Sequence, residues 1–365
     1  MKSMSVKVVL DATPFFGFPH PRGIGTYLIN LSRELSNLTD LFFAFKIERI
    51  TRPESRRRLK KLGEISSVTF IIGDSFLFPP KKRYIFHGTD LFLLKSAPKK
   101  VLTLHDLYYF KDNIEDLSLE YVEKKKSIIK RLLTEYNPDA VITPSFFVKN
   151  EVLSLFPHLE GRVQAVHHGV SPIFRPKRPE TVKERLTGLN LTYKEYLLFV
   201  GFADGRKNLK NLLRAVDSLD VKLVLTGTPL DYLKAHYPAS ERLVAGGKLK
   251  VYTRLYEEGL VDLYSGAIAL VFPSIYEGFG LPVLEAMATG TPAIVSRIDT
   301  FKEICEDAVL YCDPQDPNDI RDKIVKITSD SELRDKLREK GLNLIKKYTW
   351  ERTAYETLRV YESIS

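Results

Sequence analysis

Short apolar runs alternate with amphipathic helical patterns along the chain. Residues 6–12 predict a buried strand, and residues 23–38 carry apolar side chains at helical spacing directly after it. A long amphipathic helix with a basic face is predicted at residues 117–137. Strands that end in glycine or polar residues and lead into helices are typical of βαβ units with a parallel sheet. Further strands are predicted at 42–47, 68–73, 84–88, 100–106, 140–145 and 162–170.

A second series of the same kind follows residues 171–186, whose three prolines and mixed charges are typical of a linker. The pattern predicts an α/β protein with two doubly wound, Rossmann-like domains that face a central ligand cleft. We expect the domains at 1–172 and 173–349, with the last helix, 350–365, packing back on the first. Strands are predicted within 196–200, 221–227, 248–255, 269–272, 292–298 and 308–314, and helices at 261–267 and 281–290.

Length and composition are compatible with this organisation. A chain of 365 residues exceeds the size at which one core keeps growing, and 44% hydrophobic and 28% charged residues are ordinary for a globular protein. Charges interrupt every apolar run before it reaches the length of a membrane span, so we expect a cytoplasmic protein. Cys305 and Cys312 lack the spacing of a zinc site and are expected to be core residues.

The positive charge lies mostly in the first half of the chain. Residues 1–172 contain 26 Lys and Arg against 18 Asp and Glu, whereas residues 173–365 contain 29 against 28. The excess is concentrated in residues 49–63, 81–83 and 124–131. Such a surface attracts acidic substrates, anionic membranes or nucleic acid, or is simply solvated. The run at 56–61 has no aromatic neighbour, which disfavours nucleic acid.

The first candidate site is the segment SIYEGFGLPVLEAMATG, residues 274–290. Its glycines allow a sharp turn after a strand, and Pro282 can occupy the first helical position. The amides near Gly280 and Leu281 then offer an anion pocket at a helix N-terminus. Glu285, expected on the first helical turn, is placed to accept hydrogen bonds from a diol such as ribose, and Glu277 would face whatever is attached to the anion. The segment therefore predicts a sugar–phosphate ligand.

The second candidate site is GFADGRKN, residues 201–208, where a strand leads into a helix. Asp204 or Asn208 could cap this helix. The helix dipole disfavours cations at an N-terminus, so Arg206 and Lys207 at this position indicate a bound diphosphate. An exposed basic pair without a ligand remains an alternative.

Two further motifs lie in the first half. Gly23 and Gly25 follow the first strand but lack the third glycine of a dinucleotide-binding fingerprint, so a loop that contacts a phosphate or acceptor is favoured. His105 and Asp106 follow a buried strand, where unpaired polar groups are costly. His105 could bind substrate, with Asp106 positioning either the histidine or the acceptor, or His105 could be a satisfied structural histidine. His87 and His167–His168 also lie at strand ends, and their roles stay open.

Several motifs of other enzyme classes are absent from the sequence. It has no Gly-x-x-x-x-Gly-Lys-Ser/Thr, Gly-x-Ser-x-Gly or His-Glu-x-x-His motif, which removes the main support for ATPase, serine hydrolase and zinc protease activities. An Asp-x-Asp metal motif is absent as well.

Taken together, the motifs resemble those of the retaining, nucleotide-sugar-dependent glycosyltransferases of the GT4 group, which have the GT-B fold. The resemblance covers nearly the whole chain and is most specific where two glutamates stand eight residues apart, at Glu277 and Glu285. The other matching segments are GIGTY, TLHDL, VGFADGRKN, LYSGAIALVFPS and YTWERTA.

The resemblance implies a role for each matching residue. Glu285 would bind the ribose hydroxyls and Glu277 the donor sugar near its reacting carbon, so the two glutamates would contact opposite ends of one ligand rather than act as an acid–base pair. Arg206 and Lys207 would stabilise the departing diphosphate. The amides of Phe279, Gly280 and Leu281 would contact the sugar and phosphate. Gly25 would approach the phosphate or the acceptor. His105, with Asp106 beside it, would line the donor-sugar pocket.

Within this family the first domain binds the acceptor and the second binds the donor, and catalysis needs neither a metal ion nor another cofactor. The chain departs from many relatives in the first loop, where they have Gly-Gly and it has Arg22-Gly23-Ile24-Gly25, and at Phe202, which stands where they have arginine. Both departures recur in a subset resembling polysaccharide mannosyltransferases, which favours GDP-mannose over a UDP-sugar as donor.

The resemblance thus implies transfer of a hexose, with mannose favoured, to a hydroxyl of a glycan or lipid-linked acceptor with retention. The basic first half would suit peripheral contact with an anionic inner-membrane face. A nucleotide-sugar 2-epimerase of the same fold, or a non-catalytic protein that binds membrane or nucleic acid, remains an alternative.

Overall fold

The computed structural model describes residues 7–16, 23–46, 60–72, 75–76, 84–112, 114, 117–253, 255 and 257–365. Residues 49–59 of the basic run at 49–63, the run at 81–83, and Arg22 lie outside the described residues. The chain folds into two compact units. The N-terminal unit comprises Met1–Asn113, Leu117–Gly169 and Tyr348–Ser365, and the C-terminal unit comprises Ile114–Asp116 and Val170–Lys347.

Within the described residues, the N-terminal unit contains an eight-stranded sheet in the order β4-β3-β2-β1-β5-β6-β7-β8. Every neighbouring pair is parallel except β3 and β4. The strands are β1 Lys7–Asp11, β2 Leu41–Lys46, β3 Ser67–Ile72, β4 Ser75–Phe76, β5 Tyr84–Gly88, β6 Lys99–Thr103, β7 Ala140–Thr143 and β8 Val163–Ala165. The helices are α1 Thr13–Phe16, α2 Gly23–Leu38, α4 Leu119–Thr134, α5 Phe146–Leu155 and α15 Trp350–Ile364.

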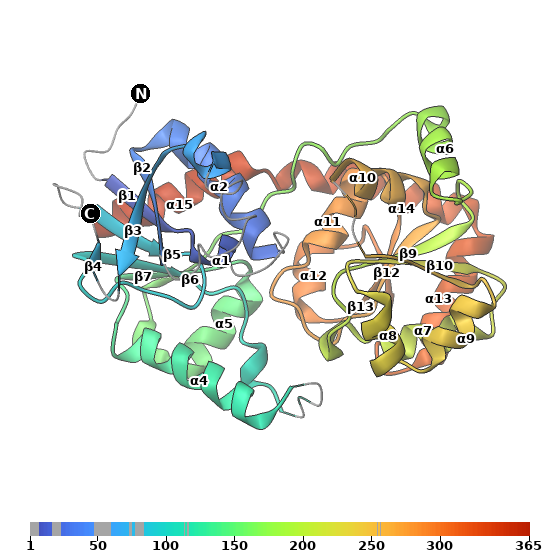
Figure 1. Ribbon diagram of the computed structural model, residues 1–365, viewed down its shortest axis with the longest axis horizontal. Coiled ribbons are helices and arrows are strands. Elements are labelled where there is room, and N and C mark those ends of the chain that lie inside the picture. Colours follow the sequence, from blue (N-terminus) through green and yellow to red (C-terminus); the bar gives the residue numbers. More distant parts are fainter. Residues whose placement is uncertain are drawn as a thin grey trace. The chain divides into compact units, whose positions relative to one another are not determined.

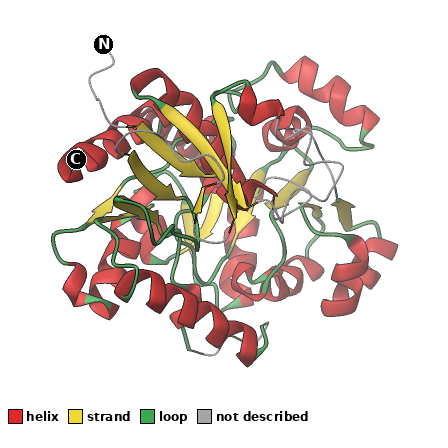
Figure 2. Ribbon diagram, turned by 60° about the vertical axis from the view of Figure 1, so that its left-hand side comes forward, coloured by secondary structure: helices red, strands yellow, loops and turns green. Residues whose placement is uncertain are grey.

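Helices flank both faces of this sheet (Figures 1 and 2). One face packs on α4 and α5 through buried apolar side chains such as Leu133, Val148 and Phe86. On the other face α2 and α15 lie side by side (Figure 1). The C-terminal helix α15 therefore belongs to the N-terminal unit, although it follows the whole C-terminal unit in sequence.

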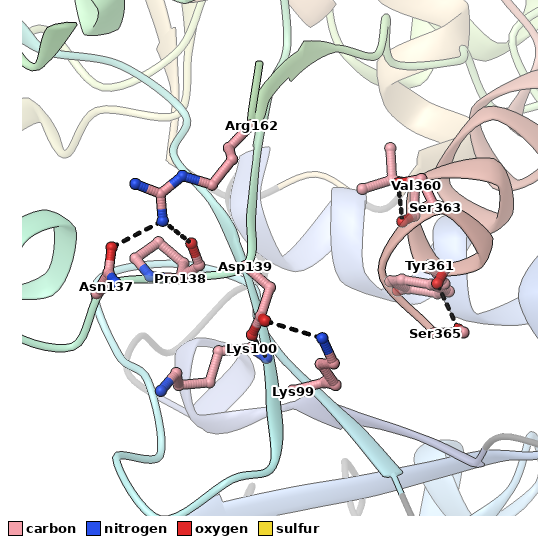
Figure 3. A network of polar contacts seen from close by, with 10 residues as sticks. All are labelled: Lys99, Lys100, Asn137, Pro138, Asp139, Arg162, Val360, Tyr361, Ser363 and Ser365. Atoms are coloured by element: carbon pink, nitrogen blue, oxygen red, sulfur yellow. Dashed lines mark hydrogen bonds and ion pairs between the residues drawn. The ribbon is translucent and has the colours of Figure 1, made fainter. Parts of the chain in front are cut away.

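Polar contacts fix the edge of this sheet at which its strands begin (Figure 3). Asp139, just before β7, accepts hydrogen bonds from the backbone of Lys100 at 2.9 Å and from Nζ of Lys99 at 3.2 Å. Arg162, just before β8, donates to the Asn137 side chain at 2.8 Å and to the Pro138 carbonyl at 3.3 Å. The starts of β6, β7 and β8 are thereby tied together, and the opposite, carboxyl edge carries the candidate site residues.

The C-terminal unit contains a six-stranded sheet in the order β11-β10-β9-β12-β13-β14, counted over its described residues, and all its pairs are parallel. The strands are β9 Tyr196–Val200, β10 Lys222–Thr226, β11 Leu249–Tyr252, β12 Ala269–Phe272, β13 Ala293–Ser296 and β14 Leu310–Cys312. The helices are α6 Pro179–Gly188, α7 Leu209–Asp217, α8 Leu230–His236, α9 Ala239–Ala245, α10 Glu257–Gly266, α11 Leu281–Ala288, α12 Asp299–Cys305, α13 Pro317–Ser329 and α14 Ser331–Leu344.

The strand order places a topological switch point between β9 and β12. From β9 the chain runs outward to β10 and β11, then returns to β12 on the other side and continues to β13 and β14. In doubly wound sheets ligands bind outside the carboxyl ends of the strands at such a point. Helices α7 and α13 pack on one face through apolar side chains, and α10 and α11 lie on the opposite face (Figure 1).

Several element bounds differ from those predicted. Helix α6 begins within the predicted linker, and the strand predicted at 162–170 ends at Ala165, so His167 and His168 lie beyond it. Helix α10 begins at Glu257, four residues before the predicted start. No helix among the described residues is long and apolar enough to cross a bilayer.

Candidate functional site

The turn after β9 is held by glycine backbones and one threonine. Gly201 has φ +132° and Gly227, at the end of the neighbouring β10, has φ +98°, a region that side-chain-bearing residues rarely adopt. A Cβ on Gly227 would lie 3.0 Å from the backbone of Gly201. The Thr228 hydroxyl donates to the Gly201 carbonyl at 2.9 Å and accepts from the Ala203 amide at 2.8 Å. The two strand ends are thereby locked together and direct the chain toward Arg206 and Lys207.

Residues 205–207 form a short 3-10 turn that packs against the segment after β12. The Ile275 amide donates to the Arg206 carbonyl at 2.8 Å. Asn208, at φ 55°, was predicted as a possible cap of α7, but its side chain does not cap this helix. Its Nδ2 instead donates to the carbonyls of Pro273 at 3.0 Å and Pro314 at 2.6 Å. Asp204, the other predicted cap, accepts from Nε of Arg206 at 3.3 Å.

This packing brings Lys207 and Glu277 together across 70 residues of sequence. Nζ of Lys207 lies 2.5 Å from Oε1 of Glu277, and the two side chains are only 12% and 8% exposed. The ammonium also lies 4.6 Å from the ring centroid of Phe272. The Glu277 backbone is fixed by the Thr300 hydroxyl, which donates to its carbonyl at 2.6 Å. A buried ion pair thus stands at the switch point, beside the β9 and β12 strand ends.

Helix α11 begins directly after this pair. Gly280 is its N-cap, at φ +113°, and a Cβ there would lie 2.6 Å from the Phe301 ring. No side chain caps the helix, so its first amides are available to an anion. Leu281 is the first helical residue and Pro282 the second, one position later than predicted.

Glu285 is the fifth residue of α11 and lies on its second turn, not on the first as predicted. The Tyr264 hydroxyl of α10 donates to Oε2 of Glu285 at 2.8 Å. Burial raises the pKa of Glu285 to about 7, the Tyr264 hydrogen bond acts in the opposite direction, and Glu257 adds a smaller upward contribution. Sequence reasoning missed this contact of Tyr264, because no local pattern links positions 21 residues apart.

In the N-terminal unit, Gly25 lies on the first turn of α2 and is buried, rather than in a loop as predicted. Tyr27 of the same helix contacts His105 edge-to-face, with ring centroids 5.0 Å apart. His105 follows β6 by two residues, and its Nε2–H donates a hydrogen bond to the Thr89 carbonyl, 2.9 Å away. Asp106 accepts from the Tyr108 amide at 3.1 Å.

His87, by contrast, is a structural residue. It is fully buried, with Nδ1 2.6 Å from the Tyr361 hydroxyl and Nε2 2.7 Å from the Thr103 hydroxyl. Burial lowers its pKa to about 3, so the ring is neutral and joins α15 to the sheet. His168 is also buried and stacks on Trp350, with ring centroids 5.8 Å apart.

A resident metal site is not evident from the side chains. In the described parts of both units, no three His, Cys, Asp or Glu side chains gather in a way that could hold a metal ion. Cys305 and Cys312 are buried free thiols.

Comparison with known proteins connects the C-terminal unit to one family. Residues 185–344 match the family model described as glycosyl transferases group 1. The chain is 27% identical to O-antigen chain mannosyltransferase B of Escherichia coli, over 93% of this chain and 96% of that protein. It is 28% identical to O-antigen chain mannosyltransferase RfbU of Salmonella typhimurium, over 60% of this chain and 57% of that protein.

Two solved structures show the fold. Sucrose-phosphate synthase from Thermosynechococcus elongatus has a TM-score of 0.75 at 19% identity, covering 98% of this chain and 99% of that one. Anabaena Alr3699/HepE in complex with UDP and glucose has a TM-score of 0.77 at 13% identity, covering 98% and 100%. The predicted GT-B fold, with two Rossmann-like units, is confirmed.

Proposed function

The chain belongs to the group 1 glycosyl transferases, and from this premise we propose that it transfers a hexose from a nucleoside diphosphate sugar to a hydroxyl group, with retained anomeric configuration. The observation that carries the proposal is the buried Lys207–Glu277 pair at the switch point of the C-terminal sheet, next to the uncapped start of α11. Cation, carboxylate and helix N-terminus are the groups that a diphosphate joined to a sugar requires.

In this proposal each group of the C-terminal unit contacts one part of the donor. Lys207, Arg206 and the amides of Gly280 and Leu281 bind the diphosphate, while Glu277 accepts hydrogen bonds from hydroxyls of the sugar. Glu285 accepts them from the ribose. Lys207 and Glu277 are paired with each other, and this contact orients both groups toward the phosphate–sugar bond.

The bond from the anomeric carbon to the diphosphate breaks as negative charge develops on the leaving phosphate. Lys207 and Arg206 stabilise that charge in a site from which water is largely excluded. The acceptor oxygen attacks from the face that the diphosphate leaves, and its proton passes to a leaving phosphate oxygen. No protein carboxylate is assigned as a base, and neither a metal ion nor another cofactor is part of the proposed reaction.

Mannose is the proposed sugar and GDP-mannose the proposed donor. The support is that two relatives are named O-antigen chain mannosyltransferases, at 27% and 28% identity. We propose a glycan or lipid-linked glycan as acceptor, bound by the N-terminal unit, with His105 and Asp106 near the donor sugar and Gly25 near the phosphate or acceptor.

We expect GDP-mannose to raise the thermal unfolding midpoint by several degrees, and more than UDP-glucose, because a ligand that binds only the folded state stabilises it by mass action. The measurement is a thermal-shift panel of nucleotide sugars, followed by NMR of the products formed with and without a glycan acceptor. Retained configuration at the new linkage supports the proposal. Inverted configuration, or conversion of UDP-N-acetylglucosamine to its epimer without any acceptor, contradicts it.

We also propose that the N-terminal unit contacts anionic membranes through α4. This helix carries exposed Lys124, Lys130 and Arg131, and at its start Leu119 is 81% exposed. Lysine and arginine near an anionic surface each contribute about 1 kcal/mol. The protein should therefore float with phosphatidylserine vesicles at low salt and dissociate at high salt.

The variant Lys124→Glu/Lys130→Glu should abolish flotation, whereas Lys336→Glu/Lys346→Glu, with the same change in charge on the C-terminal unit, should keep it. Flotation that does not depend on salt concentration, or an equal loss of flotation in both variants, would exclude α4 as the membrane contact.

A further inference from the structure

Tyr264 of α10 is fully buried, and its surroundings fix it in one position. Its ring packs edge-to-face against Phe174, with centroids 5.9 Å apart. Its carbonyl accepts a hydrogen bond from the Thr291 hydroxyl at 2.6 Å. The hydroxyl of Tyr264 is thereby fixed where it donates to Oε2 of Glu285 at 2.8 Å.

Glu285 is anchored from its own helix as well. The amide and the hydroxyl of Thr289 both donate to the Glu285 carbonyl, each at 3.1 Å. The Tyr264 hydroxyl donates to Oε2, whereas Oε1 accepts no hydrogen bond from any described residue. Oε1 is also not one of the fully buried side-chain oxygens that lack a hydrogen-bond partner. Oε2 is therefore hydrogen-bonded within the protein, and Oε1 is available to a ligand.

We propose that Tyr264 is a positioning residue for the nucleotide site, holding Oε2 of Glu285 so that Oε1 accepts the ribose hydroxyls. The inference rests on the proposed function, in which Glu285 binds the ribose. Tyr264 itself touches no ligand. It acts through the carboxylate.

The electrostatics of the pair give the proposal a measurable signature. The pKa of Glu285 is about 7 because burial raises it, while the Tyr264 hydrogen bond stabilises the ionised form. Burial also raises the pKa of Tyr264 well above its usual value, so its hydroxyl stays a donor. Glu257 on α10 is the other titratable group that acts on Glu285, and Arg338 of α14 lies beside Gly290, past the end of α11.

Only the ionised carboxylate accepts both ribose hydroxyls, so affinity for a nucleotide sugar should rise with pH through about 7. In Tyr264→Phe the stabilising hydrogen bond is lost and the pKa of Glu285 moves upward. A shift of about one unit leaves about a tenth of the carboxylate ionised at neutral pH instead of half, so affinity there falls about fivefold.

The experiment measures the dissociation constants of GDP-mannose and UDP-glucose by calorimetry from pH 6 to 9, for wild type and Tyr264→Phe. Their diphosphates are diesters that do not titrate in this range. The proposal expects the midpoint of the affinity rise to move to higher pH in the variant, and the rise to vanish in Glu285→Gln. Unchanged kcat at saturating donor, with a raised KM, is the matching kinetic result.

Tyr196→Phe is the matched control. Tyr196 is equally buried, and its hydroxyl donates to the Leu263 carbonyl of α10 at 2.7 Å, so the variant loses a comparable hydrogen bond without touching Glu285. Both variants should lose similar thermal stability, and only Tyr264→Phe should shift the pH profile. A parallel pH profile in wild type and Tyr264→Phe overturns the inference while leaving the proposed function standing.

If wild type binds neither nucleotide sugar at any pH, the proposed function fails and the inference fails with it. A measurement on wild type guards against a variant that does not fold. Carbon-13 NMR should show Glu285 Cδ titrating near pH 7 and Tyr264 Cζ shifting with the same midpoint. A Tyr264 Cζ signal that does not change as Glu285 titrates also overturns the inference.

Discussion

Replacing Lys207 with methionine is expected to lower kcat about 100- to 1,000-fold, because the developing charge on the leaving diphosphate loses its buried cation. The same change leaves Glu277 buried without its partner. Its side chain is 8% exposed, and an unpaired charge at such depth costs about 3–5 kcal/mol of unfolding free energy. Steady-state kinetics and urea unfolding of the same preparation measure the two effects.

A second variant separates catalysis from stability. In Lys207→Met/Glu277→Gln no charge is left buried, so we expect most of the lost stability to return while kcat stays low. Lys210→Met, an exposed lysine on the next helix, should leave both quantities unchanged. Recovery of kcat together with stability in the double variant would show that the pair is structural, and would remove both residues from the mechanism.

Gly169→Ala is expected to displace the start of α15 from the N-terminal unit. A Cβ at Gly169 would lie 2.2 Å from the backbone nitrogen of Trp350 and 2.4 Å from the carbonyl carbon of Thr349, closer than real Cβ atoms approach backbone. The strain should cost about 3 kcal/mol or more and lower the unfolding midpoint by about 6–12 °C. The hydrogen bond from Thr353 to the His167 carbonyl, 2.8 Å long, should break with it.

The single tryptophan of the sequence, Trp350, reports this displacement directly, since it is 3% exposed in the native fold. Its fluorescence should shift to longer wavelength in Gly169→Ala. Gly188→Ala is the control, because no atom lies within 4 Å of its added Cβ. A native emission spectrum and midpoint in Gly169→Ala would mean that the chain relaxes around the methyl group, and the contact would not be essential for docking α15.

The family and the fold were predicted from sequence because their signals are local. An apolar strand, a glycine turn and an amphipathic helix follow each other within about 20 residues. The segment that carries Glu277 and Glu285 lies within one such unit. The wrong predictions concern the roles and positions of single residues. Asn208 does not cap α7, because the carbonyls of Pro273 and Pro314, more than 60 residues away, take its amide. Helix α11 starts at Leu281, so Glu285 falls on its second turn.

The sequence by itself determined the alternation of elements, the glycine turns and which segments carry cations and carboxylates. Only the tertiary structure decided the pairings. Lys207 meets Glu277 because β9 and β12 are neighbours in the sheet, and Tyr264 meets Glu285 because α10 packs on α11. Such contacts depend on strand order and helix packing, which join residues distant in sequence, whereas hydrophobic periodicity specifies only which face of each element is buried.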